Sequence, residues 1–117
     1  MAKNHAWKKF EGTCGKLIGG ARFAANSGER FDVESPAAVG QCKLVKTLSL
    51  EALTALVEEA TAEGVRKKKI GIVFVKVRRG AGKKSPTLVV LADSMFQEWF
   101  DLNGAGEEGS VIVEGGK

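Results

Sequence analysis

The chain contains no tyrosine, one histidine and two cysteines among its 117 residues, and each shortage excludes a class of chemistry. Without tyrosine, the protein has no tyrosine nucleophile for strand transfer. The single histidine, His5, excludes a histidine-rich metal site and argues against a Ser-His-Asp mechanism. The two cysteines, Cys14 and Cys42, cannot form a disulfide framework, and their spacing fits no zinc pattern. We therefore expect both to be buried thiols.

Long hydrophobic runs are also missing. No segment approaches the roughly 18 apolar residues that span a bilayer, and residues 1–12 lack the apolar stretch of a signal peptide. We accordingly expect an intracellular, cytoplasmic protein. The chain is 44% hydrophobic and 27% charged, which provides enough apolar material for a core. We expect residues 1–103 to form a single domain and residues 104–117, rich in glycine and glutamate, to form a flexible tail.

Acidic residues are absent from a long internal segment. Between Gly64 and Ala92 there is no Asp or Glu, whereas nine Lys or Arg residues occur there. A solvated charged face would have acids interspersed among its cations. The segregation instead favours a polyanionic partner, because phosphate contacts dominate affinity for nucleic acids. The candidate DNA-binding cations are the run Arg66, Lys67, Lys68 and Lys69 and the basic finger residues Arg78, Arg79, Lys83 and Lys84.

Hydrophobic periodicity predicts a mixed sheet flanked by helices. Apolar residues recur at helical spacing in some segments and alternate with period two in others, which gives the order α-β-β-α-β-β-α. The predicted fold class is therefore α/β or α+β, with a mixed central β-sheet. The expected elements are a helix at 4–18, a strand hairpin at 30–34 and 39–45, a helix at 49–63 capped by Ser49, strands at 70–77 and 87–91, a short helix from Asp93, and either a frayed tail or a short strand at 111–113.

The same patterns predict which side chains face the core. In the first strand, Phe31 and Val33 are expected to share one face. Asp32 and Glu34 then share the other. The inward residues of the two later helices are expected to be Leu50, Leu53, Leu56, Val57 and Ala60 in the first, and Met95, Phe96, Trp99 and Phe100 in the second.

Three neighbouring predicted elements carry polar residues beside or opposite their apolar faces. Asp32 lies on one strand, and Gln41 and Lys43 lie on either side of Cys42 on the next. Glu11 lies at the edge of the buried face of the first helix. Hydrolysis of a phosphodiester needs a divalent metal held by oxygen ligands, and a lysine can position or deprotonate the attacking water. Asp32 would be the central ligand, supported by Glu11, the Gln41 side-chain oxygen and the Cys42 carbonyl.

The catalytic candidates form one pattern along the chain: Glu11, Ser27-Gly28, Asp32 and Gln41-x-Lys43, followed by a helix and an apolar strand. This pattern resembles the PD-(D/E)XK nuclease superfamily. Over about residues 7–100 the chain is most similar to the small Holliday junction resolvases of archaea and their phage relatives. The resemblance implies a restriction-endonuclease-like core and a Mg²⁺-dependent homodimer, with Mn²⁺ able to substitute, that cleaves four-way DNA junctions symmetrically. It also implies that Ser27 lies near the cleavage site.

The chain departs from the superfamily pattern at two positions. Phe31 stands before Asp32 where proline is usual, and Gln41 stands where most members have an acid. Gln-x-Lys also occurs in Mrr-like restriction nucleases, but a neutral amide is a weaker ligand for Mg²⁺ than a carboxylate. Glu34 is a candidate for the missing carboxylate, and an engineered, inactive Gln41 is a further interpretation.

Two other functions compete with a junction resolvase. One is an Mrr-like or nicking nuclease that acts on another DNA substrate. The other is a catalytically disabled module that binds DNA on the same scaffold. Metal-dependent cleavage distinguishes the enzymes from the module, and the DNA substrate distinguishes the two enzymes from each other.

Overall fold

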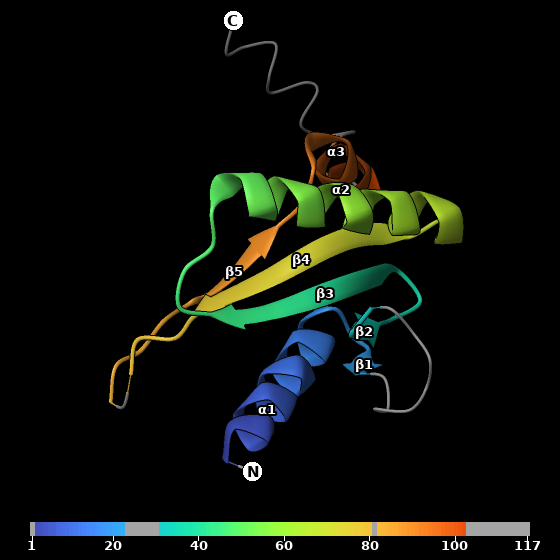
Figure 1. Ribbon diagram of the computed structural model, residues 1–117. Coiled ribbons are helices and arrows are strands. Elements are labelled where there is room, and N and C mark those ends of the chain that lie inside the picture. The colour runs from blue at the N-terminus through green and yellow to red at the C-terminus, as the bar shows by residue number, and fades with distance from the viewer. Residues whose placement is uncertain (1, 23–30, 81, 103–117) are drawn as a thin grey trace, which may run out of the picture.

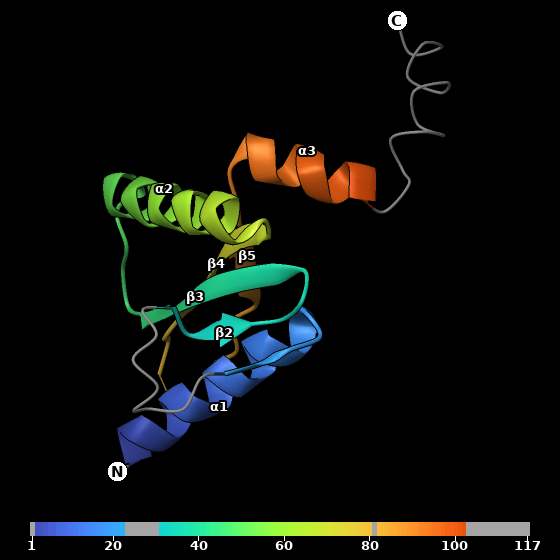
Figure 2. The same cartoon turned by 90° about the vertical axis from the view of Figure 1, so that its right-hand side faces the viewer.

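The computed structural model of the protein describes residues 2–22, 31–80 and 82–102. It is a small α+β fold in which α1 covers one face of a five-stranded mixed sheet and α2 covers the other (Figure 1). Figure 2 shows the sheet between these two helices, with α3 beside one end of α2. The elements are α1 (Ala2–Leu17), β1 (Ala21–Arg22), β2 (Val33–Glu34), β3 (Ala38–Val45), α2 (Leu50–Lys67), β4 (Ile70–Val77), β5 (Thr87–Val90) and α3 (Asp93–Leu102).

The strands follow chain order across the sheet, β1-β2-β3-β4-β5. The first three strands form an antiparallel meander, and the predicted hairpin is confirmed by the pairing of Val33 with Gly40. β3 and β4 run parallel, so the chain must cross over between them, and α2 makes that crossover. β5 returns antiparallel to β4. The mixed sheet between helices that the sequence predicts is therefore present.

One strand was missing from the expected order. β1 contains only Ala21 and Arg22, in a segment rich in small and polar residues that reads as a loop. A strand of two residues is too short to show alternation, so its pairing with β2 cannot be recognised from the sequence. The possible strand at 111–113 and the tail at 104–117 lie outside the described residues.

The core has one cluster on each face of the sheet. β4 supplies both, because its residues from Ile70 to Val75 are all buried, as expected for a central strand. The α1-side cluster contains Phe10, Cys14, Val33, Ala38, Cys42, Ile70, Ile72, Phe74 and Met95. The α2-side cluster contains Phe31, Val39, Ala60, Val73 and Val75.

The expectation that Phe31 and Val33 share a face was wrong. Phe31 packs in the α2-side cluster and Val33 in the α1-side cluster. Strand alternation holds only inside a regular ladder, and β2 begins at Val33. Phe31 lies before that ladder, so alternation does not fix the face of the sheet on which its side chain packs.

Three predicted inward residues of the helices are largely exposed. Leu50 is 80% exposed because it is the first residue of α2, beyond the part of the helix that covers the sheet. Phe96 and Trp99 of α3 are 48% and 46% exposed, while Met95 is buried. The described helices include none with the length and apolar character of a membrane span.

The second helix continues past the glycine that was expected to end it. Ser49 caps its first turn as predicted, since its Oγ accepts a hydrogen bond of 3.0 Å from the amide of Ala52. The helix then runs through Gly64 to Lys67 and ends at Lys68, whose backbone is left-handed with φ of 60°. Gly64 therefore has a role other than termination.

That role is close packing between α2 and β4. A Cβ atom on Gly71 would lie 1.9 Å from the carbonyl oxygen of Ala60, and one on Gly64 would lie 2.6 Å from that of Lys69. Both distances are impossible for real atoms. The two glycines and the small Ala60 thus let the helix backbone approach the strand directly.

We predict that Gly71→Ala lowers the free energy of unfolding by about 2–3 kcal/mol, because the added methyl forces α2 away from β4. Urea denaturation measures the change. The matched control is Gly12→Ala in α1, where a Cβ meets nothing within 4 Å and helix propensity should raise stability by up to about 1 kcal/mol. Equal denaturation midpoints for wild type and Gly71→Ala would contradict the packing role.

Candidate functional site

The strands β2 and β3 separate at Asp32. The Asp32 amide donates to the Gly40 carbonyl at 3.0 Å, and the Asp32 Oδ2 accepts a hydrogen bond of 2.8 Å from the Cys42 amide. The carboxylate therefore takes the place of a backbone acceptor in the ladder. Beyond Gly40, the β2-facing edge of β3 has no strand neighbour within the described part of the chain. We call this segment, from Gln41 to Lys43, the open edge of β3.

The backbone of Cys42 presents a second oxygen to the open edge. The N–H and C=O groups of one strand residue point to the same side of the strand, as in a hydrogen-bonded antiparallel pair. Because the Cys42 amide faces Asp32, the Cys42 carbonyl also faces the open edge. This is the orientation that the predicted ligand role of that carbonyl needs.

Gln41 and Lys43 project toward the α2 face of the sheet. Val39 and Val45 of the same strand pack in or against the α2-side cluster, and strand alternation puts the residues between them on that face. The Gln41 Oε1 is buried and has no hydrogen-bond partner in the described part of the structure. Such an atom costs free energy unless a donor or a cation satisfies it. Lys43 is half-buried.

Glu11 lies on the opposite, α1 face of the sheet. It is 6% exposed, which is rare for a carboxylate, and it lies three residues before Cys14 on the same helix. The Cys14 and Cys42 thiols are both buried, as predicted, and share a hydrogen bond. Glu11 thus joins the part of α1 that packs on β3.

The carboxylates of Asp32 and Glu11 both affect the pKa values of the two thiols. The hydrogen bond with Cys14 and burial raise the pKa of Cys42 far above its ordinary value, and the charges of Asp32 and Glu11 add to this effect. The same hydrogen bond lowers the pKa of Cys14, against the opposing effects of burial, Glu11 and Asp32. The charges of Glu11 and Asp32 thus act in the same direction on both thiols.

The structure places the predicted catalytic residues that it describes on β3, beside β3 and on the helix that packs against it. Asp32 lies in the plane of the sheet, Glu11 lies on the α1 face, and Gln41 and Lys43 lie on the α2 face. Within the described ranges, no three His, Cys, Asp or Glu residues form a cluster. Ser27 lies outside the described residues.

Glu34, the candidate for the missing carboxylate, is paired with two lysines. It forms ion pairs with Lys67, at 2.9 Å, and with Lys69. Burial raises the pKa of the Glu34 carboxyl, but the hydrogen bonds and charges of both lysines outweigh burial and hold the pKa below its ordinary value. The role of Glu34 as an extra metal ligand stays a prediction, and in this structure its carboxylate is shared by the two lysines.

The same contacts alter the expected DNA-binding role of the run 66–69. Lys67 and Lys69 pair with Glu34, and Arg66 pairs with Glu63 at 2.7 Å. A cation already paired with an acid gains less from a phosphate. Lys68 is exposed, but its backbone serves as the cap of α2.

A cleft lined by cations lies between α1 and the β4–β5 hairpin. Its volume is about 650 Å³, and six of the residues that line it are Lys or Arg, with no acid among them. Two of the six, Lys9 and Lys76, were not among the predicted DNA-binding residues. Nothing in the sequence shows that α1 faces the hairpin, so their convergence could not be recognised. The six cations of this cationic cleft are Lys9, Lys76, Arg78, Arg79, Lys83 and Lys84.

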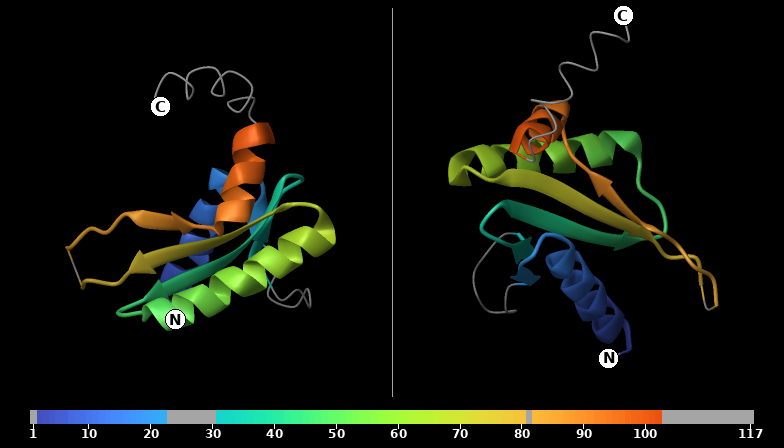
Figure 3. Two further views of the ribbon diagram at one scale, coloured as in Figure 1. Left: turned by 90° about the horizontal axis from the view of Figure 1, so that it is seen from above. Right: turned by 180° about the vertical axis from the view of Figure 1, so that it is seen from behind.

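The hairpin between β4 and β5 projects beyond the rest of the sheet, as both views of Figure 3 show. Gly80 and Gly82 have φ angles of 101° and 77°, which other residues rarely adopt. The Ser85 hydroxyl donates to the Val77 carbonyl at 2.6 Å, and Arg79 donates to the carbonyl of Lys84 at 3.1 Å. These bonds tie the two sides of the turn together.

The cationic cleft adjoins the open edge of β3. Phe10, which precedes Glu11, and Leu44, two residues after Cys42, both line the cleft. Lys76 also lines it, and its positive charge helps the Cys42 hydrogen bond to lower the pKa of Cys14. The cleft and the candidate catalytic residues thus share α1 and β3.

We predict that Glu34→Gln lowers the free energy of unfolding by about 1–2 kcal/mol at pH 7, because it leaves Lys67 and Lys69 without their shared partner. Since the folded pKa of Glu34 is lowered, its contribution is present above the unfolded value of 4.5 and is lost as the pH falls through the folded pKa. The difference between variant and wild type should therefore shrink in acid. Denaturation from pH 7 to pH 3 measures it, with the exposed Glu58→Gln as control; a difference independent of pH would contradict the ion pairs.

Comparisons with known proteins identify no relative of this chain. The chain has no significant match to a protein-family model, to a curated protein or to a solved structure. The functional argument therefore depends on the residues of this chain and on their arrangement.

Proposed function

We propose that the protein is a metal-dependent DNA endonuclease of the Holliday junction resolvase type. The observation that carries this proposal is the cationic cleft, which is lined by neighbours in the chain of the candidate catalytic residues on α1 and β3. The order of helix, three-stranded meander, crossover helix and parallel strand supports the restriction-endonuclease-like core that the resemblance implies.

The cationic cleft suits the phosphate backbone of DNA. Its six cations line a concave surface without a compensating acid, and phosphate contacts supply most of the affinity of a protein for DNA. Such contacts position a duplex without reading its sequence. The cleft therefore supports an enzyme that recognises the shape of its substrate.

The donor set at the open edge fits a hard divalent cation. Asp32 and Glu11 provide carboxylates, the Cys42 carbonyl faces the same edge, and the buried Gln41 Oε1 has no partner among the described residues. All four donors are oxygens, which Mg²⁺ and Mn²⁺ prefer. When bound there, the ion would activate water and neutralise charge on the phosphate.

The protein's own residues would orient the reaction. The hydrogen bond from the Cys42 amide fixes the Asp32 carboxylate, so that one oxygen is anchored and the other is presented in a defined direction. Lys43 would position the attacking water and stabilise the negative charge that develops on the phosphate. We assign Ser27 to the scissile phosphate on the basis of the resemblance alone.

The direct test is cleavage of a labelled synthetic four-way junction in the presence of Mg²⁺, Mn²⁺ or EDTA. We expect paired symmetric nicks that require the metal. Asp32→Asn should lower the rate by about 100-fold or more, because the amide keeps the shape but loses the charge. Glu58→Gln, on the exposed face of α2, should leave the rate unchanged. Equal cleavage of linear and nicked duplexes would instead indicate an Mrr-like or nicking enzyme.

A DNA-binding module without catalytic activity is the second candidate, and Gln41 is the observation that favours it. With an amide at this position, the proposed ligands include two acids, Asp32 and Glu11, and one negative charge fewer than in most members of the superfamily. Tight binding of the junction without cleavage by the wild type would favour the module. Activity gained on Gln41→Glu would then identify a disabled nuclease, whereas continued inactivity would leave binding as the function.

We predict that removing cations from the cleft weakens DNA binding and makes it less sensitive to salt. In Lys76→Gln and Arg78→Gln, the slope of log affinity against log salt should become shallower by about 1 for each cation that contacts a phosphate. Arg66→Gln is the matched control, because Arg66 is bound to Glu63 outside the cleft. Fluorescence anisotropy of a labelled junction over a salt series measures both quantities; identical slopes for all variants would contradict the assignment of the cleft.

A further inference from the structure

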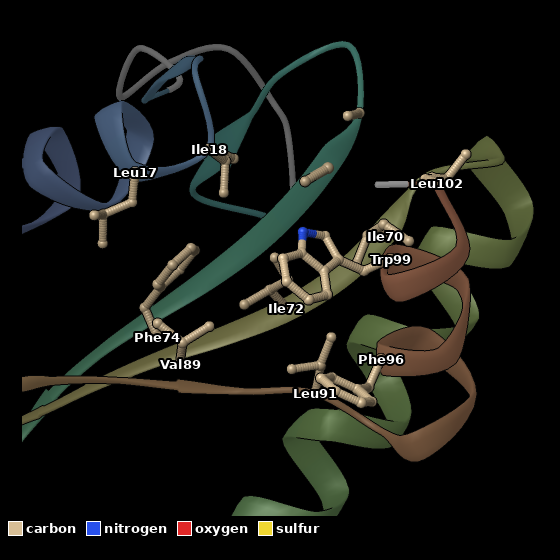
Figure 4. A pocket seen from close by; sticks show the side chains of 12 residues that line it. Leu17, Ile18, Ile70, Ile72, Phe74, Val89, Leu91, Phe96, Trp99 and Leu102 are labelled. Atoms are coloured by element: carbon tan, nitrogen blue, oxygen red, sulfur yellow. The ribbon is translucent and has the colours of Figure 1, made fainter. Parts of the chain in front are cut away.

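An apolar groove lies on the α1 face of the sheet, between the end of α1 and α3 (Figure 4). The end of α1 forms one wall, α3 forms the other, and strands β3 to β5 form the floor. Its volume is about 780 Å³. We propose that this groove binds a basic amphipathic helix of a partner protein, that is, a helix with an apolar stripe flanked by lysine or arginine.

The groove contains most of the large apolar side chains that are exposed. Among the described residues, eight large hydrophobic residues are exposed, and five of them line the groove. Single exposed apolar residues are common on soluble proteins, whereas a continuous apolar surface marks a binding site. The five residues are between 46% and 69% exposed, and they are Leu17, Val89, Phe96, Trp99 and Leu102.

The α3 wall has the spacing that a helical ligand requires. Phe96, Trp99 and Leu102 follow one another at three-residue spacing, so each lies beside the next on the surface of α3. The ring centroids of Phe96 and Trp99 are 5.9 Å apart. In Figure 4 the Trp99 side chain extends from α3 over the floor of the groove. A partner helix can place the apolar residues of its successive turns against such a row.

The wall is held in place by the protein itself. Met95 of α3 is buried in the α1-side cluster, and its Sδ accepts a hydrogen bond of 3.2 Å from the amide of Gly71. α3 is therefore anchored to β4 through Met95 while its neighbours Phe96 and Trp99 stay about half exposed. A groove that is formed in advance loses little conformational entropy when a ligand binds.

The lining of the groove favours a helix over a small molecule. All twelve residues that line it are aliphatic or aromatic. A site for a small molecule usually places a few polar groups around its ligand to fix the orientation. A helix in a groove is instead oriented by the fit of its apolar stripe and by charges beside the contact. The charges on the walls therefore indicate which helices the groove accepts.

The walls carry more acids than cations. α3 contains three exposed acids, Asp93, Glu98 and Asp101, and no Lys or Arg. The last turn of α1 adds one cation, Lys16. Negative charge beside an apolar contact attracts a partner with positive charge. We therefore expect the partner helix to carry Lys or Arg on the side that faces α3.

The acids of α3 also disfavour the other occupants. Pairing of α3 with its own copy would set the acids of one helix against those of the other, with no cation on either. Residues 103–117, which follow α3 in the chain, contain three acids and one lysine, so they are acidic too. DNA and anionic membranes are repelled for the same reason. A basic helix gains from both the apolar floor and the acidic wall.

The test uses the full chain without DNA, so its outcome is independent of the proposed nuclease activity. The probe is a synthetic amphipathic helix of leucine and lysine, about 14 residues or four turns long. In a Trp7→Phe background Trp99 is the sole tryptophan, and its emission should shift to shorter wavelength when the peptide binds. The expected Kd is about 10 μM. A scrambled peptide without an apolar face should cause no shift; an equal shift with it, or no saturable shift at about 100 μM of the amphipathic peptide, would overturn the proposal.

Substitutions on the two walls locate the binding site. Leu17→Lys and Leu102→Lys should each weaken peptide binding by about 10-fold or more, because a positive charge enters the apolar contact and repels the basic peptide. Both leucines are the last residues of their helices, where lysine suits the helix dipole, so both variants should fold. Val65→Lys is the matched control, because Val65 is 66% exposed in the last turn of α2, outside the groove. Unchanged binding in both groove variants would place the site elsewhere.

Charge changes test the class of partner. A peptide with glutamate in place of lysine should bind about 10-fold more weakly or worse, because its acids face those of α3. The double variant Glu98→Gln, Asp101→Asn should weaken binding of the lysine peptide by about 5-fold at low salt, since two favourable charge pairs are lost. Glu58→Gln on the exposed face of α2 is the control. Equal binding of the two peptides would contradict the preference for a basic helix.

Two results on the protein alone would assign the groove to another occupant. A second copy would fill the groove if the Trp99 emission shifts with protein concentration and Leu102→Lys dissociates a dimer seen by analytical ultracentrifugation. Residues 103–117 would fill it if the protein stays monomeric and Ile112→Asp shifts the Trp99 emission to longer wavelength. Either result would overturn the proposal.

Discussion

The direct contact between α2 and β4 is the constraint on which the rest of the structure depends. Ala60 lies against Gly71, and Gly64 lies against the turn that leads into β4, with no room for a further carbon atom. This contact holds the crossover helix flat on the central strand and thereby aligns β4 parallel to β3. β3 carries the candidate catalytic residues, and β4 forms part of the floor of the apolar groove between α1 and α3. The contact between α2 and β4 therefore positions both the catalytic residues and this groove.

The candidate site exists because β2 begins only at Val33, so that its pairing with β3 does not extend past Gly40. If its pairing with β3 continued, backbone groups would satisfy the Cys42 amide and close the edge. Asp32 instead supplies the acceptor through its side chain, so that one carboxylate both completes the hydrogen bonding and remains at the open edge. Glu11 reaches the same region from α1 because the Cys14–Cys42 contact packs that helix against β3.

The sequence predicts the larger part of the fold, because long elements carry strong periodic signals. The continuous apolar run of β4, the Ser49 cap and the alternation in β3 were recognised correctly. What the sequence could not show depends on contacts between distant elements. Lys9 joins the hairpin cations only because α1 packs across the sheet, and Glu34 is bound by lysines more than thirty residues away. For the same reason, helical spacing alone did not reveal that Phe96 and Trp99 are about half exposed.

The division of the site between α1 and the sheet has a consequence for local unfolding. Residues 38–77 form a continuous strand-helix-strand unit that is held by the parallel pairing of β3 with β4. Glu11 and Cys14 join this unit only when α1 docks on it. Partial unfolding that releases α1 alone therefore removes a carboxylate and exposes two thiols while the crossover unit remains folded.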